Sequence, residues 1–251
     1  REMLSKCRGR FTPAFLSLQK ALSIVKISRD AFRYLSSFAG GQIIEQYTGD
    51  VNPVIEVALV NGRYQLNAEN VNYSYGPLHD AFRRYFHLDP PELIPGDEVL
   101  ILGFGAGSVA VILREELGFN NPITGIELDR AVLRAAQEHF NIGRLPALEI
   151  FRGDAFNFVE NCVLNFKLIV VDIYLDRLVP PQFETETFIR NLHRLLTPGG
   201  RVVFNKFAGS QRLETETSAL KDRFAEVFSN TNTLRIAVNK RAPNLMITRT
   251  R

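Results

Sequence analysis

The chain has 251 residues, 45% of them hydrophobic and 23% charged, with a formal net charge of +3. That length and apolar content suffice for a complete core in one domain, or in one domain with a small appendage. The small net charge argues against nucleic acid as a partner, and without an apolar run of about 18 residues we expect no membrane span.

The two cysteines, Cys7 and Cys162, are far apart in the sequence and fit no metal-ligand spacing. They favour a reduced, cytoplasmic setting, and no secretory signal peptide is recognisable. The chain begins at Arg1 rather than at methionine, so we expect residues upstream of it. The four histidines are scattered and are interpreted as surface or packing residues, so we expect no metal.

The spacing of apolar residues changes along the first ninety residues. Residues 11–38 carry apolar side chains at three- and four-residue steps, which predicts a helix used for packing or oligomer contact. Three short strands are then predicted, at residues 42–47, 54–60 and 63–66. Asn61-Gly62 predicts a two-residue hairpin turn because both positions tolerate positive φ.

A helix is predicted at residues 78–86, and the prolines and glycine of residues 88–97 end this region. We therefore predict two parts. Residues 1–90 form a small helical and antiparallel β unit, and residues 91–251 form an α/β domain.

Residues 98–129 carry the strongest pattern in the chain. An apolar run, 99–102, is followed by the glycine-rich stretch 103–107, a helical stretch, a second apolar run and then Glu127. This order is typical of the first βαβ unit of a nucleotide-binding sheet, where glycines let the backbone turn tightly and a ligand approach closely. Glu127, at the end of the second strand, can accept hydrogen bonds from two ribose hydroxyls.

The glycine pattern alone fits enzymes that use NAD and enzymes that use S-adenosylmethionine. The dinucleotide fingerprint requires a third glycine where this chain has Ser108. Strands and helices continue to alternate as far as residue 228, including a helix predicted at 185–196 that ends at a turn of residues 197–200. Strands 233–240 and 244–250 predict a terminal antiparallel hairpin. Five parallel strands followed by a hairpin favour the doubly wound fold of class I S-adenosylmethionine-dependent methyltransferases.

Five stretches, together with the β-rich lead-in at 61–66, resemble the spermidine synthase family over roughly residues 55–210. They are residues 99–115, 123–140, 148–159, 168–183 and 188–205. The resemblance implies a transferase, usually dimeric, that binds S-adenosylmethionine or its decarboxylated form.

The resemblance also implies roles for individual residues. The loop of Gly103, Phe104, Gly105, Ala106 and Gly107 would line the methionine-derived tail of the cofactor, and Glu127 with the following Leu128 would hold the ribose. Further cofactor contacts are implied for Asp154 and Ala155 at the adenine, for Gln65 and Tyr75 over the cofactor, and for Asp172 as the catalytic acid. The alternative interpretation of Asp154 is a helix cap alone.

Three departures bear on the reaction. Ala106 stands where the family has an aspartate that holds the ammonium group of decarboxylated S-adenosylmethionine. Asp172 and Asp176 are separated by three residues instead of two, with Arg177 where the family has proline. The stretch Tyr75-Gly76-Pro77 lacks the acid that lines the polyamine site, although Glu69 is a further candidate.

These departures favour a methyltransferase with an altered polyamine site, acting on an unidentified small acceptor. We expect ordinary S-adenosylmethionine to bind at least as well as the decarboxylated form. Two alternatives remain open: a working aminopropyltransferase with a divergent site, and a non-catalytic module that keeps the cofactor fold for binding or assembly.

Overall fold

The computed structural model describes residues 29–68, 71–175, 178–208, 211–237 and 243–251. Contacts between Cα atoms divide the chain into two compact units. Among the described residues, the first unit comprises 29–42 and 59–63, and the second comprises 43–58 together with everything from residue 64 onward.

The first unit holds a helix at residues 29–36 and the turn of a hairpin. The helix predicted over 11–38 is observed from residue 29; residues 11–28 lie outside the described part of the chain. Asn61 and Gly62 have φ values of 50° and 73°, as the predicted turn requires. The Asn61 amide donates to the Ser37 carbonyl at 3.0 Å, and the Gly62 amide donates to the Ser37 hydroxyl at 2.9 Å.

A four-stranded sheet has the order β1-β2-β3-β4. Its strands are β1 (Gln42–Tyr47), β2 (Ile55–Val60), β3 (Arg63–Ala68) and β4 (Val71–Ser74). The first three confirm the predicted strands, but β4 was not predicted. It is only four residues long, and asparagine has low strand propensity, so its sequence gives little strand signal. Its register on β3 also shifts between Leu66 and Asn67.

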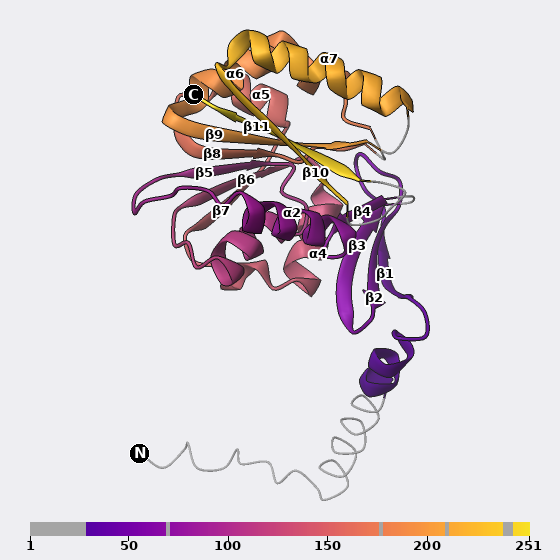
Figure 1. Cartoon of the computed structure of the whole chain (residues 1–251). Coiled ribbons are helices and arrows are strands. Elements are labelled where there is room, and N and C mark those ends of the chain that lie inside the picture. The colour runs from indigo at the N-terminus through magenta and orange to yellow at the C-terminus, as the bar shows by residue number, and fades with distance from the viewer. Residues whose placement is uncertain (1–28, 69–70, 176–177, 209–210, 238–242) are drawn as a thin grey trace, which may run out of the picture. The chain divides into compact units, whose positions relative to one another are not determined.

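The larger sheet has seven strands in the order β10-β11-β9-β8-β5-β6-β7 (Figure 1). Its strands are β5 (Val99–Leu102), β6 (Ile123–Glu127), β7 (Leu148–Arg152), β8 (Phe166–Val171), β9 (Leu196–Phe207), β10 (Asn230–Ile236) and β11 (Asn244–Thr250). The strands from β5 to β9 pair in parallel, while β11 runs antiparallel to β9 and β10. The predicted doubly wound class I methyltransferase fold is therefore confirmed.

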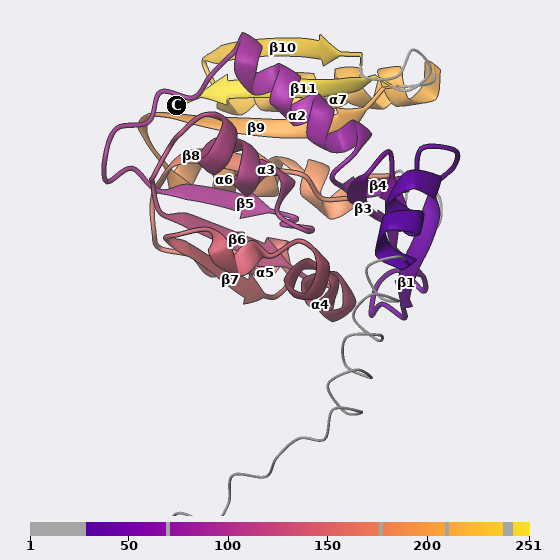
Figure 2. The same cartoon turned by 90° about the horizontal axis from the view of Figure 1, so that it is seen from below.

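Helices cover both faces of this sheet (Figures 1 and 2). The helices are α2 (Pro77–Leu88), α3 (Ser108–Val111) continued by a π-helical turn (Ile112–Glu116), α4 (Arg130–His139), α5 (Ala155–Asn161), α6 (Glu186–Leu195) and α7 (Gln211–Val227). None of the helices in the described part of the chain is long and apolar enough to cross a membrane.

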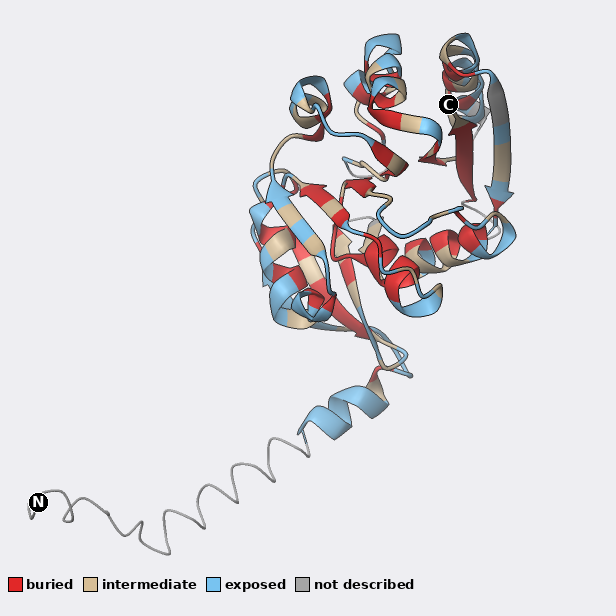
Figure 3. Cartoon of the chain, turned by 90° about the vertical axis from the view of Figure 1, so that its left-hand side faces the viewer, coloured by how far each residue is buried: buried red, intermediate tan, exposed pale blue. Residues whose placement is uncertain are grey.

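The core has two layers because side chains alternate along each strand. On β5, Val99 and Ile101 pack in the cluster that includes α2, α3 and α4, whereas Leu100 and Leu102 pack in the cluster that includes α5, α6 and α7. Figure 3 shows the buried residues concentrated along the strands and on the helix faces turned toward them.

Several boundaries differ from their predictions; the strand predicted at 233–240, for example, is observed as β10 at Asn230–Ile236. The helix expected to run to Leu196 ends at Leu195, and Leu196 already pairs with Phe166 of β8. The predicted turn at residues 197–200 is absorbed into β9, where pairing resumes at Leu168 opposite Arg201. Residues 238–242, which include most of the predicted return between the last two strands, lie outside the described residues.

Candidate functional site

The carboxyl ends of β5, β6, β7 and β8 border one cavity of about 450 Å³ within the second unit. Ligands of doubly wound sheets bind outside these strand ends, because the loops that follow the strands meet there. Seven of the predicted site residues line the cavity: Gly103, Gly105, Glu127, Leu128, Asp154, Ala155 and Asp172.

The glycine loop has the backbone shape that the sequence predicts. Gly103 and Gly105 have φ values of 79° and 58°. A Cβ on Gly103 would lie 2.2 Å from the Asp172 carbonyl oxygen, and one on Gly105 would lie 2.8 Å from the Ser74 hydroxyl. Here the glycines allow the loop to pass close to protein atoms of β4 and of the segment after β8.

Glu127 ends β6 with its carboxylate beside this loop. One oxygen accepts the Gly105 amide at 2.9 Å and the other accepts the Asp129 amide at 3.0 Å. Burial raises the pKa of Glu127, and these two amides oppose the rise. A carboxylate has about four lone-pair sites, so Glu127 keeps acceptor capacity toward the cavity.

Asp154 caps α5 as well as lining the cavity. One of its oxygens accepts the Phe156 and Asn157 amides at 2.7 and 3.0 Å. The helix-cap interpretation of Asp154 is thus correct, and its position at the end of β7 is also compatible with a ligand contact.

Asp172 follows β8 and is held by a chain of amides that the sequence analysis missed. The Asn205 side chain donates to Asp172 Oδ1 at 2.8 Å, and the Asn244 side chain donates to Asn205 Oδ1 at 2.8 Å. Burial raises the pKa of Asp172 to about 7; the Asn205 hydrogen bond opposes the rise and Glu127 adds to it. A carboxyl group with this pKa can hold or release a proton near neutrality.

Tyr75 and Gln65 do not border the cavity. The Tyr75 ring stacks on Phe140 and His79, with centroids 4.7 and 5.4 Å away, and burial raises the pKa of Tyr75 to about 12. Tyr75 has a φ of 53°, so the alternation of side chains between the two faces of the sheet, which holds along β4, does not continue to Tyr75. Tyr73, two residues earlier, lines the cavity instead and donates its hydroxyl to the Tyr174 carbonyl at 3.2 Å.

Three residues of the glycine loop are buried and do not reach the cavity. Phe104, Ala106 and Gly107 do not line the cavity; Ala106 is fully buried, and its amide donates to the Ser74 hydroxyl at 2.9 Å. The Phe104 ring lies against Gly125, where a Cβ would come within 2.4 Å of the ring. Ala106 and Phe104 therefore fix the loop through contacts with protein atoms, a packing role that their position in the glycine motif does not reveal.

Asp129 is a further residue that the sequence analysis missed. It caps α4 by accepting the Ala131 amide at 2.8 Å, and it accepts the Asp50 and Val51 amides at 3.2 and 3.1 Å. This buried carboxylate therefore fixes the loop between β1 and β2 against the start of α4, and Val51 and Asp129 both line the cavity.

The cavity wall beyond β8 is mostly apolar and aromatic. It is formed by Tyr73, Ile173, Tyr174, Leu175, Pro180, Pro181, Gln182, Phe183 and Phe207. Among the described lining residues, Asp172 is the one acid that borders this end; Glu127, Asp129 and Asp154 follow β6 and β7. Asp176 and Glu69, the other acids considered from the sequence, lie outside the described residues.

Comparison with known proteins agrees with this fold. The methyltransferase domain family matches residues 94–244. A probable polyamine aminopropyl transferase of Bifidobacterium longum is 32% identical over 138 residues, which is 55% of this chain and 30% of that protein. A polyamine aminopropyltransferase of Vibrio vulnificus is 25% identical over 136 residues, which is 53% of this chain and 45% of that protein.

Among solved structures, a probable spermidine synthase of Corynebacterium glutamicum superimposes with a TM-score of 0.69 and 23% identity, covering 83% of this chain and 80% of that chain. The fold is thus a class I methyltransferase fold of the spermidine synthase-like kind. The chain belongs to the methyltransferase domain family. The matched region spans less than half the length of the two curated relatives.

Proposed function

We propose that this protein is a transferase that binds S-adenosylmethionine and moves its methyl group to a small, largely apolar acceptor. The observation that carries the proposal is the contrast within the cavity. One end carries Glu127 and Asp154, two carboxylates suited to an adenosine, while the other end is walled mainly by aromatic and aliphatic side chains.

For the cofactor, the proposal assigns Glu127 to the ribose hydroxyls and Asp154 with Ala155 to the adenine. The cavity volume of about 450 Å³ lies within the range of about 300–1,000 Å³ common for small-molecule sites. Gly103 and Gly105 lie beside the remaining stretch, where the methionine-derived tail would extend toward Asp172.

For the reaction, the sulfonium group of the cofactor supplies an activated methyl carbon that an acceptor atom attacks in line. The protein orients the acceptor and takes up its proton. Asp172 is suited to the proton because its pKa of about 7 leaves a substantial fraction ionised at neutral pH. Asn205 keeps the carboxyl group in place through its hydrogen bond to Oδ1.

For the acceptor, the apolar wall argues against a polyamine. A polyamine carries several positive charges, and burying each one without a carboxylate partner is costly. Among the described residues at that end of the cavity, Asp172 alone supplies a negative charge, whereas Tyr174, Phe183 and Phe207 supply aromatic surface. An acceptor with one reacting hydroxyl, amine or thiol on an apolar body fits better.

Aminopropyl transfer is the second candidate. Two observations favour it: Asp172 follows β8, and the Bifidobacterium longum relative is named a probable polyamine aminopropyl transferase. In a non-catalytic binding module, the third candidate, the same cavity would hold an adenosine ligand without turnover.

Calorimetric titration with S-adenosylmethionine and with its decarboxylated form tests the proposal. We expect the first to bind at least as tightly, because Gly103 and Gly105, the loop residues that line the cavity, carry no carboxylate to repel its own carboxylate. A parent protein that binds the decarboxylated form about ten times more tightly would favour aminopropyl transfer.

A further inference from the structure

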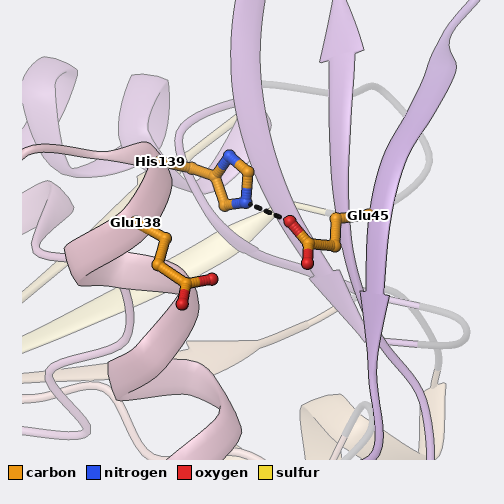
Figure 4. A group of neighbouring side chains, drawn as sticks. All are labelled: Glu45, Glu138 and His139. Atoms are coloured by element: carbon orange, nitrogen blue, oxygen red, sulfur yellow. Dashed lines mark hydrogen bonds and ion pairs between the residues drawn. The ribbon is translucent and has the colours of Figure 1, made fainter.

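A group of metal-binding side chains lies outside the cavity, where β1 meets the last turn of α4. Glu45 comes from β1, and Glu138 and His139 end α4. Figure 4 shows the His139 ring and the Glu45 carboxylate pointing toward one another, with the Glu138 carboxylate beside them. One ligand atom from each residue lies within 4.8 Å of the other two.

Contacts around these atoms hold them in place. His139 Nε2 lies 2.9 Å from Glu45 Oε2 and 2.9 Å from the Tyr47 hydroxyl, which donates to Glu138 Oε2 at 2.8 Å. The other Glu138 oxygen accepts from Arg134 Nε at 2.9 Å. Arg134 therefore orients Glu138 and leaves its second oxygen directed at the group, as outer partners of metal ligands do.

The charge of the group favours a cation. Two carboxylates face one guanidinium, so with a neutral imidazole one negative charge is in excess. His139 is also the last residue of the ten-residue helix α4, where free backbone carbonyls and the helix dipole stabilise positive charge. The side chains of Glu45 and Glu138 are about 40% exposed, which gives an ion access from solvent.

We propose that Glu45, Glu138 and His139 form a site for a divalent transition-metal ion of the Zn²⁺ class. Imidazole nitrogen and carboxylate oxygen are both ligand types that zinc takes, and the three atoms need to approach to roughly 3.5 Å from one another around a tetrahedral ion. Rotation of the exposed carboxylates supplies that movement. A water takes the fourth position, Tyr47 supports Glu138 as an outer partner, and the ion ties β1 to the end of α4.

Titration of the untagged full chain with Zn²⁺ tests this proposal. We expect one equivalent to bind and the melting temperature to rise relative to protein in chelator. Loss of an outer partner of a metal ligand costs about 10–100-fold in affinity, so His139→Gln should weaken binding by at least about 100-fold and Tyr47→Phe by about tenfold. Mg²⁺ should not compete, because it avoids imidazole.

His87→Gln is the matched control. His87 lies in the last turn of α2 and contacts the Arg83 carbonyl at 2.8 Å, so it shares the helix-terminal setting without the two carboxylates. Its removal should leave zinc affinity unchanged. Absence of zinc binding at low micromolar metal would overturn the proposal, and so would equal affinity of the parent, His139→Gln and Glu45→Gln. Neither result bears on the S-adenosylmethionine site, which these variants leave intact.

Discussion

The two ends of the cavity differ in how they are built. At the β6 and β7 end, Glu127 is the last residue of β6, Asp154 follows the end of β7 by two residues, and backbone amides fix each carboxylate. At the β8 end, Asp172 is fixed by the side chain of Asn205 from β9, which is fixed in turn by Asn244 from β11. The first arrangement is local in the sequence, and the second depends on three strands of the assembled sheet.

This difference separates binding from chemistry. Carboxylates held by backbone amides are oriented wherever the strand and loop form, so the adenosine binding proposed for the β6 and β7 end would not depend on the acceptor. The protonation of Asp172 depends on burial and on a neighbouring side chain, so the β8 end is sensitive to substitution. The following variants test that separation, from the largest expected effect to the smallest.

Glu127→Ala should cause the largest loss of cofactor affinity. Each hydrogen bond from a ribose hydroxyl to a charged carboxylate contributes about 1.5–3 kcal/mol, and two are proposed. Calorimetric titration with S-adenosylhomocysteine measures the loss. Glu149→Ala on the neighbouring strand β7 removes an exposed glutamate outside the cavity and should bind like the parent. A folded Glu127→Ala protein with parental affinity would refute the ribose assignment.

Asp172→Asn should change how stability depends on pH. Because the folded pKa of about 7 lies above the ordinary value of 3.8, the neutral carboxyl contributes stability below about pH 4, and this contribution is lost as the pH rises to about 7. The variant should therefore equal the parent in acid and exceed it by about 1–3 kcal/mol above neutrality. Urea unfolding of both proteins across this range provides the measurement; parallel pH profiles would show that Asp172 titrates normally.

Asp154→Asn should separate the cap from the ligand contact. Asparagine caps helices about as well as aspartate, so the melting temperature should stay close to that of the parent. Affinity for S-adenosylhomocysteine should fall by about 1 kcal/mol as the charged acceptor is lost. Asp154→Ala is the comparison that also loses the cap, at about 1 kcal/mol of stability. Unchanged affinity in both variants would leave Asp154 as a helix cap alone.

Tyr73→Phe should have the smallest effect. It removes the hydrogen bond to the Tyr174 carbonyl and should lower the free energy of unfolding by about 0.5–1.5 kcal/mol, while leaving S-adenosylhomocysteine affinity unchanged. Parallel urea unfolding and calorimetry give both numbers. A large loss of cofactor affinity would mean that Tyr73 belongs to the cofactor end of the cavity.

Patterns in the sequence predicted those elements whose conformation depends on residues close to one another in the chain. The apolar run 99–102, the glycines after it and Glu127 after the next run give the βαβ unit and one end of the cavity, since each depends on neighbours in the chain. The Asn61-Gly62 turn is equally local, because its positive φ values are a property of those two residues.

Contacts between distant residues decided the rest. Tyr73 rather than Tyr75 reaches the cavity because β4 ends between them with a positive φ, and the strand signal of β4 was too short to predict that end. Asn205 looked like an ordinary residue of an apolar strand, yet the pairing of β8, β9 and β11 places it between Asp172 and Asn244.

The same holds for Glu45 and His139, which are 94 residues apart: the sequence analysis interpreted His139 as a surface or packing residue and did not single out Glu45. A spacing pattern reveals ligands only when one helix or loop carries them. Here the docking of β1 against α4 brings them together, so the sequence determined the fold and the cofactor end of the cavity. The tertiary structure alone determined the surroundings of Asp172 and the cluster at the end of α4, because these depend on which strands and helices become neighbours.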